Sequence, residues 1–361
     1  MIKVLVVDDS ALMRKLLGQI FSREPDFAVA FAPNGLEALD KLASFEPNVI
    51  TLDVHMPQMD GLACLDRIMV ERPCPVVMVS SLTAADADAT LEAFRLGAVD
   101  FVAKPDKVSS LYIDELGAEL LSKVRAAAGA KLKSSLRLKD RVRHRVGVAP
   151  PSSRSVKTQP PASVEAAVGE GLVLVGTSTG GPPALETLLT ALPADFAWPI
   201  LIAQHMPATF TGPLARRLDN LSALTVMEVN DPVLLKAGCA YIARGGGDLV
   251  VGRRSAGLVA SPVAARSDYL WHPSTDRLVR SALDCLPASQ LVGVLMTGMG
   301  NDGAEAMALL HQQGGRTIAE AEESAVVWGM PGELVQLGGA DFIVALPGIA
   351  NQLQKLTPPC R

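Results

Sequence analysis

Short apolar runs alternate with helix-period stretches through two long parts of this chain. Residues 1–124 contain runs such as KVLVVDD, NVITLDV and PVVMVSS, separated by amphipathic patterns such as LMRKLLGQIF. Residues 171–361 return to the same alternation, with runs such as LVLVG, PILIAQH and LVGVLMTG. Strands that alternate with helices at this spacing form parallel sheets covered by helices on both faces. The sequence therefore predicts an α/β protein with two doubly wound parallel-sheet domains.

Residues 125–170 differ from both neighbouring parts. They are rich in Ala, Ser, Pro, Lys and Arg, and their net charge is +7, against −8 for residues 1–124 and −4 for residues 171–361. We expect a flexible basic linker here. Its first part, KLKSSLRLKDRVRHR, is either a solvated spacer or a basic amphipathic helix that contacts an acidic partner or nucleic acid. The acidic charge of the two large parts argues against nucleic acid as their own partner.

The sequence favours a cytoplasmic location. No apolar run approaches the ~20 residues that a membrane-spanning helix needs. The first residues, MIKVLVVDDS, reach two aspartates after a short apolar run, unlike a secretory signal. The five cysteines are odd in number and lack CxxC spacing, so we expect reduced thiols rather than disulfides or zinc ligands.

Polar side chains stand where the predicted strands of residues 1–124 end. These residues are Asp8, Asp9, Asp53, Ser80 and Lys104. Ligands of parallel sheets bind outside the carboxyl ends of the strands. Three close carboxylates repel one another unless a cation lies between them, and oxygen ligands of this kind suit Mg²⁺. A carboxylate in such a site can also accept a phosphoryl group, whose charge a metal and a lysine stabilise.

A simpler interpretation gives each of these residues a separate role. Asp9 and Ser10 could cap the following helix, Asp53 could cap a turn, and Lys104 could be solvated. We favour a shared site because all of these residues end strands of one predicted domain. A dehalogenase-type phosphatase is an enzymatic rival, but its DxD motif is absent from the first strand, where the two aspartates are adjacent.

The stretches VLVVDDS, TLDVHMPQMDG, VVMVSS and FVAKP make residues 1–124 resemble a response-regulator receiver domain. The resemblance implies a (βα)5 fold with Asp53 as the phosphoacceptor. The Mg²⁺ ligands that it implies are Asp8, Asp9, Asp53 and the backbone carbonyl of His55. The switch residues that it implies are Ser80, Phe101 and Lys104.

The stretch GTSTGG follows the first apolar run of the second part. It lacks the lysine of a phosphate-binding P-loop, and its glycines do not have dinucleotide-binding spacing. Gly176, Ser178 and Gly180 do fit G-x-S-x-G, a sharp strand-to-helix turn that exposes a nucleophilic hydroxyl. The helix N-terminus that follows offers free N–H groups, among them that of Thr179, for an oxyanion.

A serine nucleophile needs a base and an acid that orients the base. His205 ends the run PILIAQH and is the favoured base, whereas His272, in the loop LWHPSTD, is the fallback. Asp302 follows the run LVGVLMTGMGND and is the favoured acid. The other acid candidates are Asp231, Asp248 and Asp276. Ser178, His205 and Asp302 thus follow three different predicted strands, although a histidine at a strand end is often only a satisfied polar residue.

The stretches GTSTGGPPAL, AQHMP, TGMGNDGA and WGMPGEL resemble the catalytic domain of chemotaxis protein-glutamate methylesterases, the CheB family. The order receiver, linker and esterase then matches the whole chain. The resemblance implies a Rossmann-like three-layer αβα domain in which Ser178 is the nucleophile, His205 the general base and acid, and Asp302 its orienting partner. Thr179 and Met299 would lie at the oxyanion site.

The same resemblance implies a function and partners. The substrates would be glutamate methyl esters on chemoreceptors, which would bring the enzyme to membrane-bound receptor arrays; some receptor glutamines would be deamidated. A chemotaxis histidine kinase would donate the phosphoryl group, and we expect a monomer. Many family members have an arginine where this chain has His272. Two alternatives stay open: a non-enzymatic regulator whose second domain binds a partner, and an esterase for small molecules.

Overall fold

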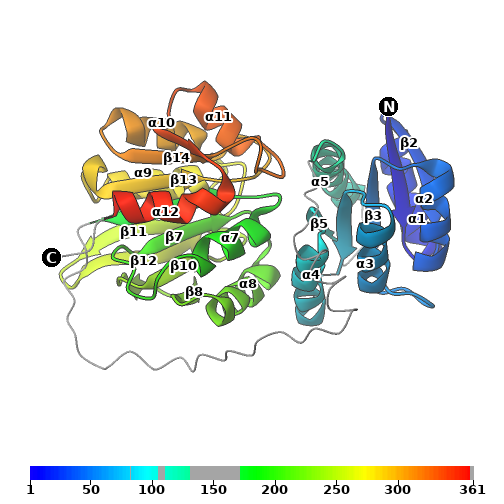
Figure 1. Ribbon diagram of the computed structural model, residues 1–361, viewed down its shortest axis with the longest axis horizontal. Coiled ribbons are helices and arrows are strands. Elements are labelled where there is room, and N and C mark those ends of the chain that lie inside the picture. Colours follow the sequence, from blue (N-terminus) through cyan, green and yellow to red (C-terminus); the bar gives the residue numbers. More distant parts are fainter. Residues whose placement is uncertain (82, 105–109, 131–170, 358–361) are drawn as a thin grey trace.

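The computed structural model describes residues 1–81, 83–104, 110–130 and 171–357, which fold into two α/β domains (Figure 1). The first domain holds a five-stranded sheet of order β2-β1-β3-β4-β5, in which all paired strands are parallel. Its strands are β1 (Ile2–Val7), β2 (Phe27–Ala32), β3 (Val49–Asp53), β4 (Val76–Ser80) and β5 (Asp100–Ala103). Its helices are α1 (Ala11–Ser22), α2 (Gly35–Phe45), α3 (Gly61–Glu71), α4 (Ala84–Leu96) and α5 (Ser110–Ala128).

Successive side chains of each strand point to opposite faces of this sheet, and helices pack on both faces. Val4 and Val6 of β1 pack with α1 and α5, whereas Leu5 and Val7 of the same strand pack with α2, α3 and α4. Polar side chains start the helices, because an N-cap oxygen accepts a hydrogen bond from an otherwise unpaired N–H. Ser10, for example, accepts from the Met13 N–H at 3.3 Å and so caps α1.

The second domain holds a seven-stranded parallel sheet of order β15-β14-β13-β6-β7-β10-β8. Its strands are β6 (Leu172–Thr177), β7 (Ile200–Gln204), β8 (Thr225–Val229), β10 (Cys239–Ala243), β13 (Leu291–Leu295), β14 (Arg316–Glu320) and β15 (Phe342–Val344). Its helices are α7 (Gly181–Thr190), α8 (Ala208–Leu221), α9 (Thr275–Leu283), α10 (Ala304–Gln312), α11 (Met330–Gln336) and α12 (Leu346–Leu356), with a short 3₁₀ helix at Ala288–Gln290.

The helices of this domain form two layers around the sheet. Val173 and Val175 of β6 pack with α7, α8 and α12, whereas Leu172 and Leu174 pack with α9, α10 and α11. The prediction of two doubly wound domains is therefore confirmed. A small antiparallel sheet was not predicted: β9 (Val233–Leu234), β11 (Gly247–Arg254) and β12 (Gly257–Ala264) pair in the order β11-β12-β9.

The two domains share a hydrophobic core. Phe94 and Phe101 of the first domain belong to the same buried cluster as Phe210 and Leu214 of the second. Figure 1 shows the first domain beside the second, with α4, β5 and α5 on the side that faces it. The interface is therefore packed, and Phe101 of β5 lies buried in it.

Several predictions concern the ends and the linker. Helix α5 continues to Ala128, beyond the predicted domain boundary at residue 124. Residues 131–170 of the predicted linker, which include KLKSSLRLKDRVRHR, lie outside the described residues, as does Cys360. The other four cysteines are free thiols. No helix of the described chain combines the length and apolar character that crossing a bilayer requires.

Candidate active site and phosphorylation site

Three neighbouring strands of the seven-stranded sheet bring the predicted hydrolytic residues together. Ser178 directly follows β6, the middle strand of the three, and His205 directly follows β7. Asp302 lies between β13, on the other side of β6, and α10. The chain connections run in opposite directions from β6, and such a reversal opens a crevice at the carboxyl edge of a parallel sheet.

The turn at Ser178 is tight because two glycines allow it. β6 ends at Thr177 and α7 begins at Gly181, so only three residues join strand to helix. Gly180 adopts a φ of +76°, a left-handed conformation that other residues rarely take. A Cβ on Gly298 would lie 2.8 Å from the Cβ of Ser178. The G-x-S-x-G stretch therefore forms the strand-to-helix turn that its spacing predicted.

His205 and Asp302 form a hydrogen-bonded pair beside this turn. His205 Nε2 lies 2.8 Å from Asp302 Oδ2; the Asp302 side chain is buried, and that of His205 is only 9% exposed. His205 Nδ1 is buried as well, and it has no hydrogen-bond partner in the described chain. The Trp271 ring stacks on the imidazole, with 5.8 Å between centroids and 3° between planes. The imidazole is thus held by a carboxylate at one nitrogen and by an aromatic face.

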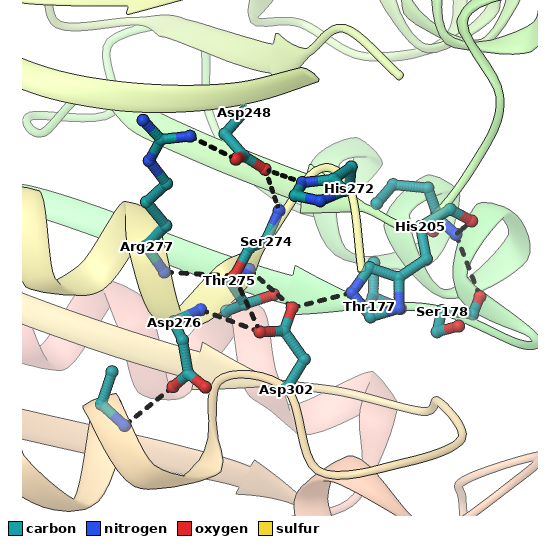
Figure 2. A network of polar contacts seen from close by, with 12 residues as sticks. Thr177, Ser178, His205, Asp248, His272, Ser274, Thr275, Asp276, Arg277 and Asp302 are labelled. Atoms are coloured by element: carbon teal, nitrogen blue, oxygen red, sulfur yellow. Dashed lines mark hydrogen bonds and ion pairs between the residues drawn. The ribbon is translucent and has the colours of Figure 1, made fainter. Parts of the chain in front are cut away.

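The N-terminus of α9 holds the Asp302 carboxylate (Figure 2). The Ser274 hydroxyl donates to Oδ1 at 3.0 Å, and the N–H of Thr275 donates to Oδ2 at 2.6 Å. The Asp276 N–H adds a third bond, at 3.1 Å. Burial alone would raise the pKa of Asp302, but His205 and these N–H groups together lower it below its usual value. Asp302 is therefore an anion that accepts a hydrogen bond from the Nε2–H of His205.

A second histidine–aspartate pair lies at the same helix end. His272 Nδ1 is 2.9 Å from Asp248 Oδ1, and Arg277 Nη1 is 2.6 Å from Asp248 Oδ2. The structure therefore pairs His272, the predicted fallback base, with Asp248 and not with Asp302. Of the other acid candidates, Asp276 accepts a hydrogen bond from the Ala306 N–H at 2.9 Å, and Asp231 is exposed.

The two predicted oxyanion residues both touch the first domain. The Thr179 hydroxyl donates a hydrogen bond to the Asp100 carboxylate, and the next residue, Gly180, donates its N–H to the Val99 carbonyl at 3.2 Å. The Met299 sulfur accepts from the Ser122 hydroxyl at 3.0 Å. A cavity of about 620 Å³ between α5 and Met299 lies along this contact. The turn that carries Ser178 is therefore tied to β5 of the first domain.

The predicted acidic residues of the first domain also converge. Each of Asp8, Asp9 and Asp53 offers a carboxylate oxygen, and the three atoms lie within 4.8 Å of one another. Lys104 Nζ lies 2.7 Å from Asp53 Oδ2 and 3.0 Å from Asp8 Oδ2. Apart from this ion pair, Asp8 Oδ2 is a buried oxygen without a hydrogen bond in the described chain. An unsatisfied buried oxygen among three carboxylates fits the oxygen shell of Mg²⁺.

The charges of this cluster shift one another's pKa. Burial raises the pKa of Asp53, and the Asp8 carboxylate adds to the rise, although Lys104 opposes it. Burial alone would lower the pKa of Lys104, but Asp53 and Asp8 raise it above its usual value. The Lys104 ammonium contacts two of the three clustered carboxylates, so a further positive charge beside them would be stabilising.

The predicted switch residues lie along β4 and β5. Ser80 is fully buried, and its hydroxyl lies 3.4 Å from the Ser81 carbonyl. The Phe101 ring lies 4.4 Å from the Phe210 ring of the second domain, between centroids. The His55 side chain is mostly exposed and contacts Asp86 at 2.6 Å; its predicted role concerns only its backbone carbonyl and stays a prediction.

Sequence reasoning missed the residues that support these groups. Trp271 and Ser274 belong to the LWHPSTD stretch, where a helix-capping pattern was readable but its carboxylate partner was not. Asp100 was read only as the start of a strand. Its contact with Thr179 joins two domains, and nothing in the local pattern indicates such a pairing.

Family models match both domains. The model described as CheB methylesterase matches residues 173–353, and that of the response regulator receiver domain matches residues 4–113. A protein-glutamate methylesterase/protein-glutamine glutaminase of Rhodopseudomonas palustris is 56% identical over 97% of this chain and 96% of its own length. A protein of the same name from Carboxydothermus hydrogenoformans is 44% identical over 98% of this chain and 99% of its own length.

A solved structure resembles the second domain. The CheB methylesterase catalytic domain of Thermotoga maritima has 35% sequence identity and a TM-score of 0.51. The match covers 52% of this chain and 100% of the other.

Proposed function

This chain belongs to the CheB methylesterase family and carries a receiver domain, and from that premise we propose that it is a phosphorylation-activated protein-glutamate methylesterase. Its substrates are γ-methyl glutamate esters of chemoreceptors, from which it releases methanol, and receptor glutamines, from which it releases ammonia. The observation that carries the proposal is the hydrogen-bonded His205–Asp302 pair beside the Ser178 turn.

The state of His205 follows from its partner. An ionised carboxylate only accepts hydrogen bonds, so the proton between His205 and Asp302 resides on Nε2. Nδ1 then carries a lone pair, and it is the buried nitrogen without a partner. A lone pair at this position is what a base for the Ser178 hydroxyl requires.

The proposed reaction has two balanced steps. The Ser178 oxygen attacks the ester carbonyl while His205 Nδ1 takes the hydroxyl proton, and the same nitrogen returns it to the departing methoxide, which leaves as methanol. Water then attacks the acyl-enzyme and gives one proton to His205, which passes it to the Ser178 oxygen as the acyl bond breaks. The glutamate leaves as a carboxylic acid that releases its proton to the solvent. In this proposal the backbone N–H groups of Thr179 and Met299 donate to the oxyanion. With glutamine, ammonia is the first leaving group.

The receiver cluster supports phosphoryl transfer to Asp53. Mg²⁺ held by Asp8, Asp9, Asp53 and the His55 carbonyl would neutralise charge on the phosphoryl oxygens. Lys104 already contacts Asp53 and supplies a second positive charge there. The phosphodonor is a chemotaxis histidine kinase, and the reaction takes place in the cytoplasm, at receptor arrays.

Strand β5 connects the two sites. Lys104, just beyond its last residue, contacts Asp53. Asp100, its first residue, and Val99, just before it, accept hydrogen bonds from the Thr179–Gly180 turn. Four residues of parallel strand span only ~13 Å. Phosphorylation of Asp53 draws Lys104 and Ser80 toward the phosphoryl group, shifts Phe101 against Phe210, and so loosens the contact at Thr179. The receptor segment then reaches Ser178.

Methanol release from methylated receptors, with and without acetyl phosphate and Mg²⁺, tests the proposal. Ser178→Ala is expected to lower methanol release at least about 10³-fold while Asp53 is still phosphorylated. Asp53→Ala is expected to keep the unstimulated rate but lose the stimulation. Near-wild-type methanol release by the Ser178 variant would place the nucleophile elsewhere, and stimulation that survives in the Asp53 variant would refute the gating.

A further inference from the structure

Gln204 is a buried amide that contacts the Ser178 turn, and the reaction described above gives it no part. It is the last residue of β7, directly before His205, and its side chain is buried. Its Nε2 donates one hydrogen bond to the Ser178 carbonyl and one to the His205 carbonyl, each at 3.1 Å. One side chain thus joins the backbone of the proposed nucleophile to that of the proposed base.

The chemistry around this amide fixes its orientation. With its two ends exchanged, the amide oxygen would face two carbonyl oxygens, which only accept hydrogen bonds. In the observed orientation, Gln204 Oε1 is buried and has no hydrogen-bond partner in the described chain. A Cβ on Gly181 would collide with Oε1, so the glycine leaves room for it. A buried acceptor without a partner lowers stability, so stability alone does not account for an amide at this position.

The bond from Gln204 to Ser178 also sets the direction of the next N–H. The Ser178–Thr179 peptide bond is planar and trans, so its carbonyl and its N–H point in opposite directions. That N–H belongs to Thr179, which donates to the oxyanion in the proposed reaction, and it donates no hydrogen bond among the described residues. A donor that holds the Ser178 carbonyl on one side therefore determines where the Thr179 N–H points on the other.

The neighbouring peptide groups of the turn are held by the loop after β13. The Ser178 N–H donates to the Thr297 carbonyl at 3.0 Å, and the Thr297 hydroxyl donates to the Thr179 carbonyl at 2.8 Å. The Ser178 carbonyl also accepts from the Gly181 N–H at 2.8 Å, within the turn itself. Among these contacts, that of Gln204 ties the peptide group between Ser178 and Thr179 to a strand of the sheet.

We propose that Gln204 is a positioning residue of the hydrolytic reaction, whose amide holds the Ser178–Thr179 peptide with the Thr179 N–H aimed at the oxyanion. The inference rests on the proposed function, because it concerns the same Ser178 site. Negative charge on the substrate oxygen develops only as Ser178 attacks, so the contact stabilises the transition state more than the bound substrate. Gln204 acts through the peptide group and leaves the proton transfers to His205.

Two substitutions test the amide. Gln204→Met keeps an unbranched side chain of the same length but removes the donor to both carbonyls. Gln204→Asn keeps the amide on a side chain that is one methylene shorter, which is too short to hold the Ser178 and His205 carbonyls together. The Asn variant decides the question by the same measurement if the Met variant does not fold.

The experiment measures kcat/KM for methanol release by the full chain with acetyl phosphate and Mg²⁺. The substrates are two matched receptor-helix peptides, one with γ-methyl glutamate and one with the corresponding thionoester, in which sulfur replaces the carbonyl oxygen. Sulfur is a weak hydrogen-bond acceptor, so N–H groups aimed at an oxyanion favour the ester. The ratio of the two values does not depend on the concentration of folded enzyme, and a displaced His205 would lower both values alike.

The expected loss is specific to the oxygen ester. Gln204→Met is expected to lower kcat/KM for the ester about 10- to 100-fold, less than the complete loss of an oxyanion donor. The ester-to-thionoester ratio is expected to fall about five- to tenfold, while KM for the ester stays within about twofold. Gln204→Asn is expected to change the ratio in the same direction.

The control is Thr317→Val, which removes a buried hydroxyl near the start of β14, at the opposite edge of the sheet from Ser178. The Thr317 hydroxyl donates to the Gly339 carbonyl at 2.5 Å. The Thr317 N–H donates at 2.9 Å to Asp341 Oδ2, and the same carboxylate oxygen lies 3.1 Å from His311 Nδ1. Thr317→Val is expected to lower the thermal unfolding midpoint and to keep the wild-type ratio.

Three outcomes would overturn the inference. They are a wild-type ratio in the folded Gln204 variant, an equal fall of the ester and thionoester values, and a wild type that does not prefer the ester. A wild type that releases no methanol from either peptide refutes the proposed function instead.

Discussion

The receiver cluster and the Ser178 site are built from similar parts with opposite electrostatics. In the receiver, burial and the Asp8 carboxylate raise the pKa of Asp53, although Lys104 opposes the rise. In the esterase, hydrogen bonds outweigh burial and lower the pKa of Asp302. An added cation would stabilise the receiver cluster. In the Ser178 site, the hydrogen-bond donors to Asp302 are already in place without any ligand.

This difference explains where control can act. A site that lacks positive charge responds to Mg²⁺ and a phosphoryl group, so it can serve as a sensor. In a site whose His–Asp pair is already assembled, regulation can change only the access of the substrate and the conformation of the turn around Ser178. The structure places the Asp100–Thr179 bond at that turn. The following predictions test whether the two sites differ in this way and whether β5 joins them.

The largest effect is expected from Asp302→Asn. An amide can turn its NH₂ toward His205 Nε2, which moves the imidazole proton to Nδ1 and removes the base for Ser178. Methanol release should fall by a factor on the order of 10³–10⁴, with Asp53 phosphorylation unchanged. The matched control is Asp341→Asn, in the His311 pair. A loss of less than about tenfold would mean that Asp302 does not fix the tautomer.

The positions of the main residues of both sites could be predicted from the sequence. Ser178 and His205 each follow an apolar run, and parallel sheets gather such strand ends at one edge. Local pattern also located Asp53 and Lys104. The roles of these residues stay predictions, because the comparisons with known proteins concern whole domains and not single side chains.

The remainder depends on tertiary contacts that no local pattern contains. Thr179 and Asp100 are 79 positions apart in different domains. Ser274 carries an ordinary capping signal, which does not disclose that it serves two buried carboxylates. The β11–β12 pairing was missed because its strands were not among the apolar runs read from the sequence. Such features follow from how elements pack, so periodicity and spacing cannot supply them.

The second prediction concerns the link between the two sites. Asp100→Ala removes a charged acceptor, whose hydrogen bond contributes about 1.5–3 kcal/mol. Unstimulated methanol release should rise about tenfold, and the stimulation by acetyl phosphate should shrink in proportion. Thr179→Ser keeps a hydroxyl at the contact and should keep the wild-type stimulation. An unstimulated rate equal to that of wild type in the Asp100 variant would show that β5 does not restrain the turn.

The third prediction concerns the receiver charges. A carboxylate whose pKa is raised by folding destabilises the folded state at pH values above that pKa, where it is charged. Asp53→Asn removes this charge and should stabilise the protein by about 1 kcal/mol or less at pH 7 in EDTA. Thermal unfolding should show a midpoint a few degrees higher, roughly 2–4 °C. Asp302→Asn should shift the midpoint the other way, and shifts of equal sign would contradict the electrostatic contrast.

The smallest effect is expected from the charged rim of the domain interface. Arg217 Nη1 and Glu92 Oε2 are 3.9 Å apart, and Arg95 competes for the same carboxylate at 2.7 Å through Nε. Partly exposed pairs of this kind contribute about 0–1 kcal/mol, so Glu92→Gln should change the acetyl phosphate stimulation less than about twofold. The comparison with Asp100→Ala is direct, because both variants remove one receiver carboxylate that faces the esterase. If the Glu92 variant gave the larger release of activity, the domains would be held by surface charge, and the buried contact at Thr179 would not be the restraint.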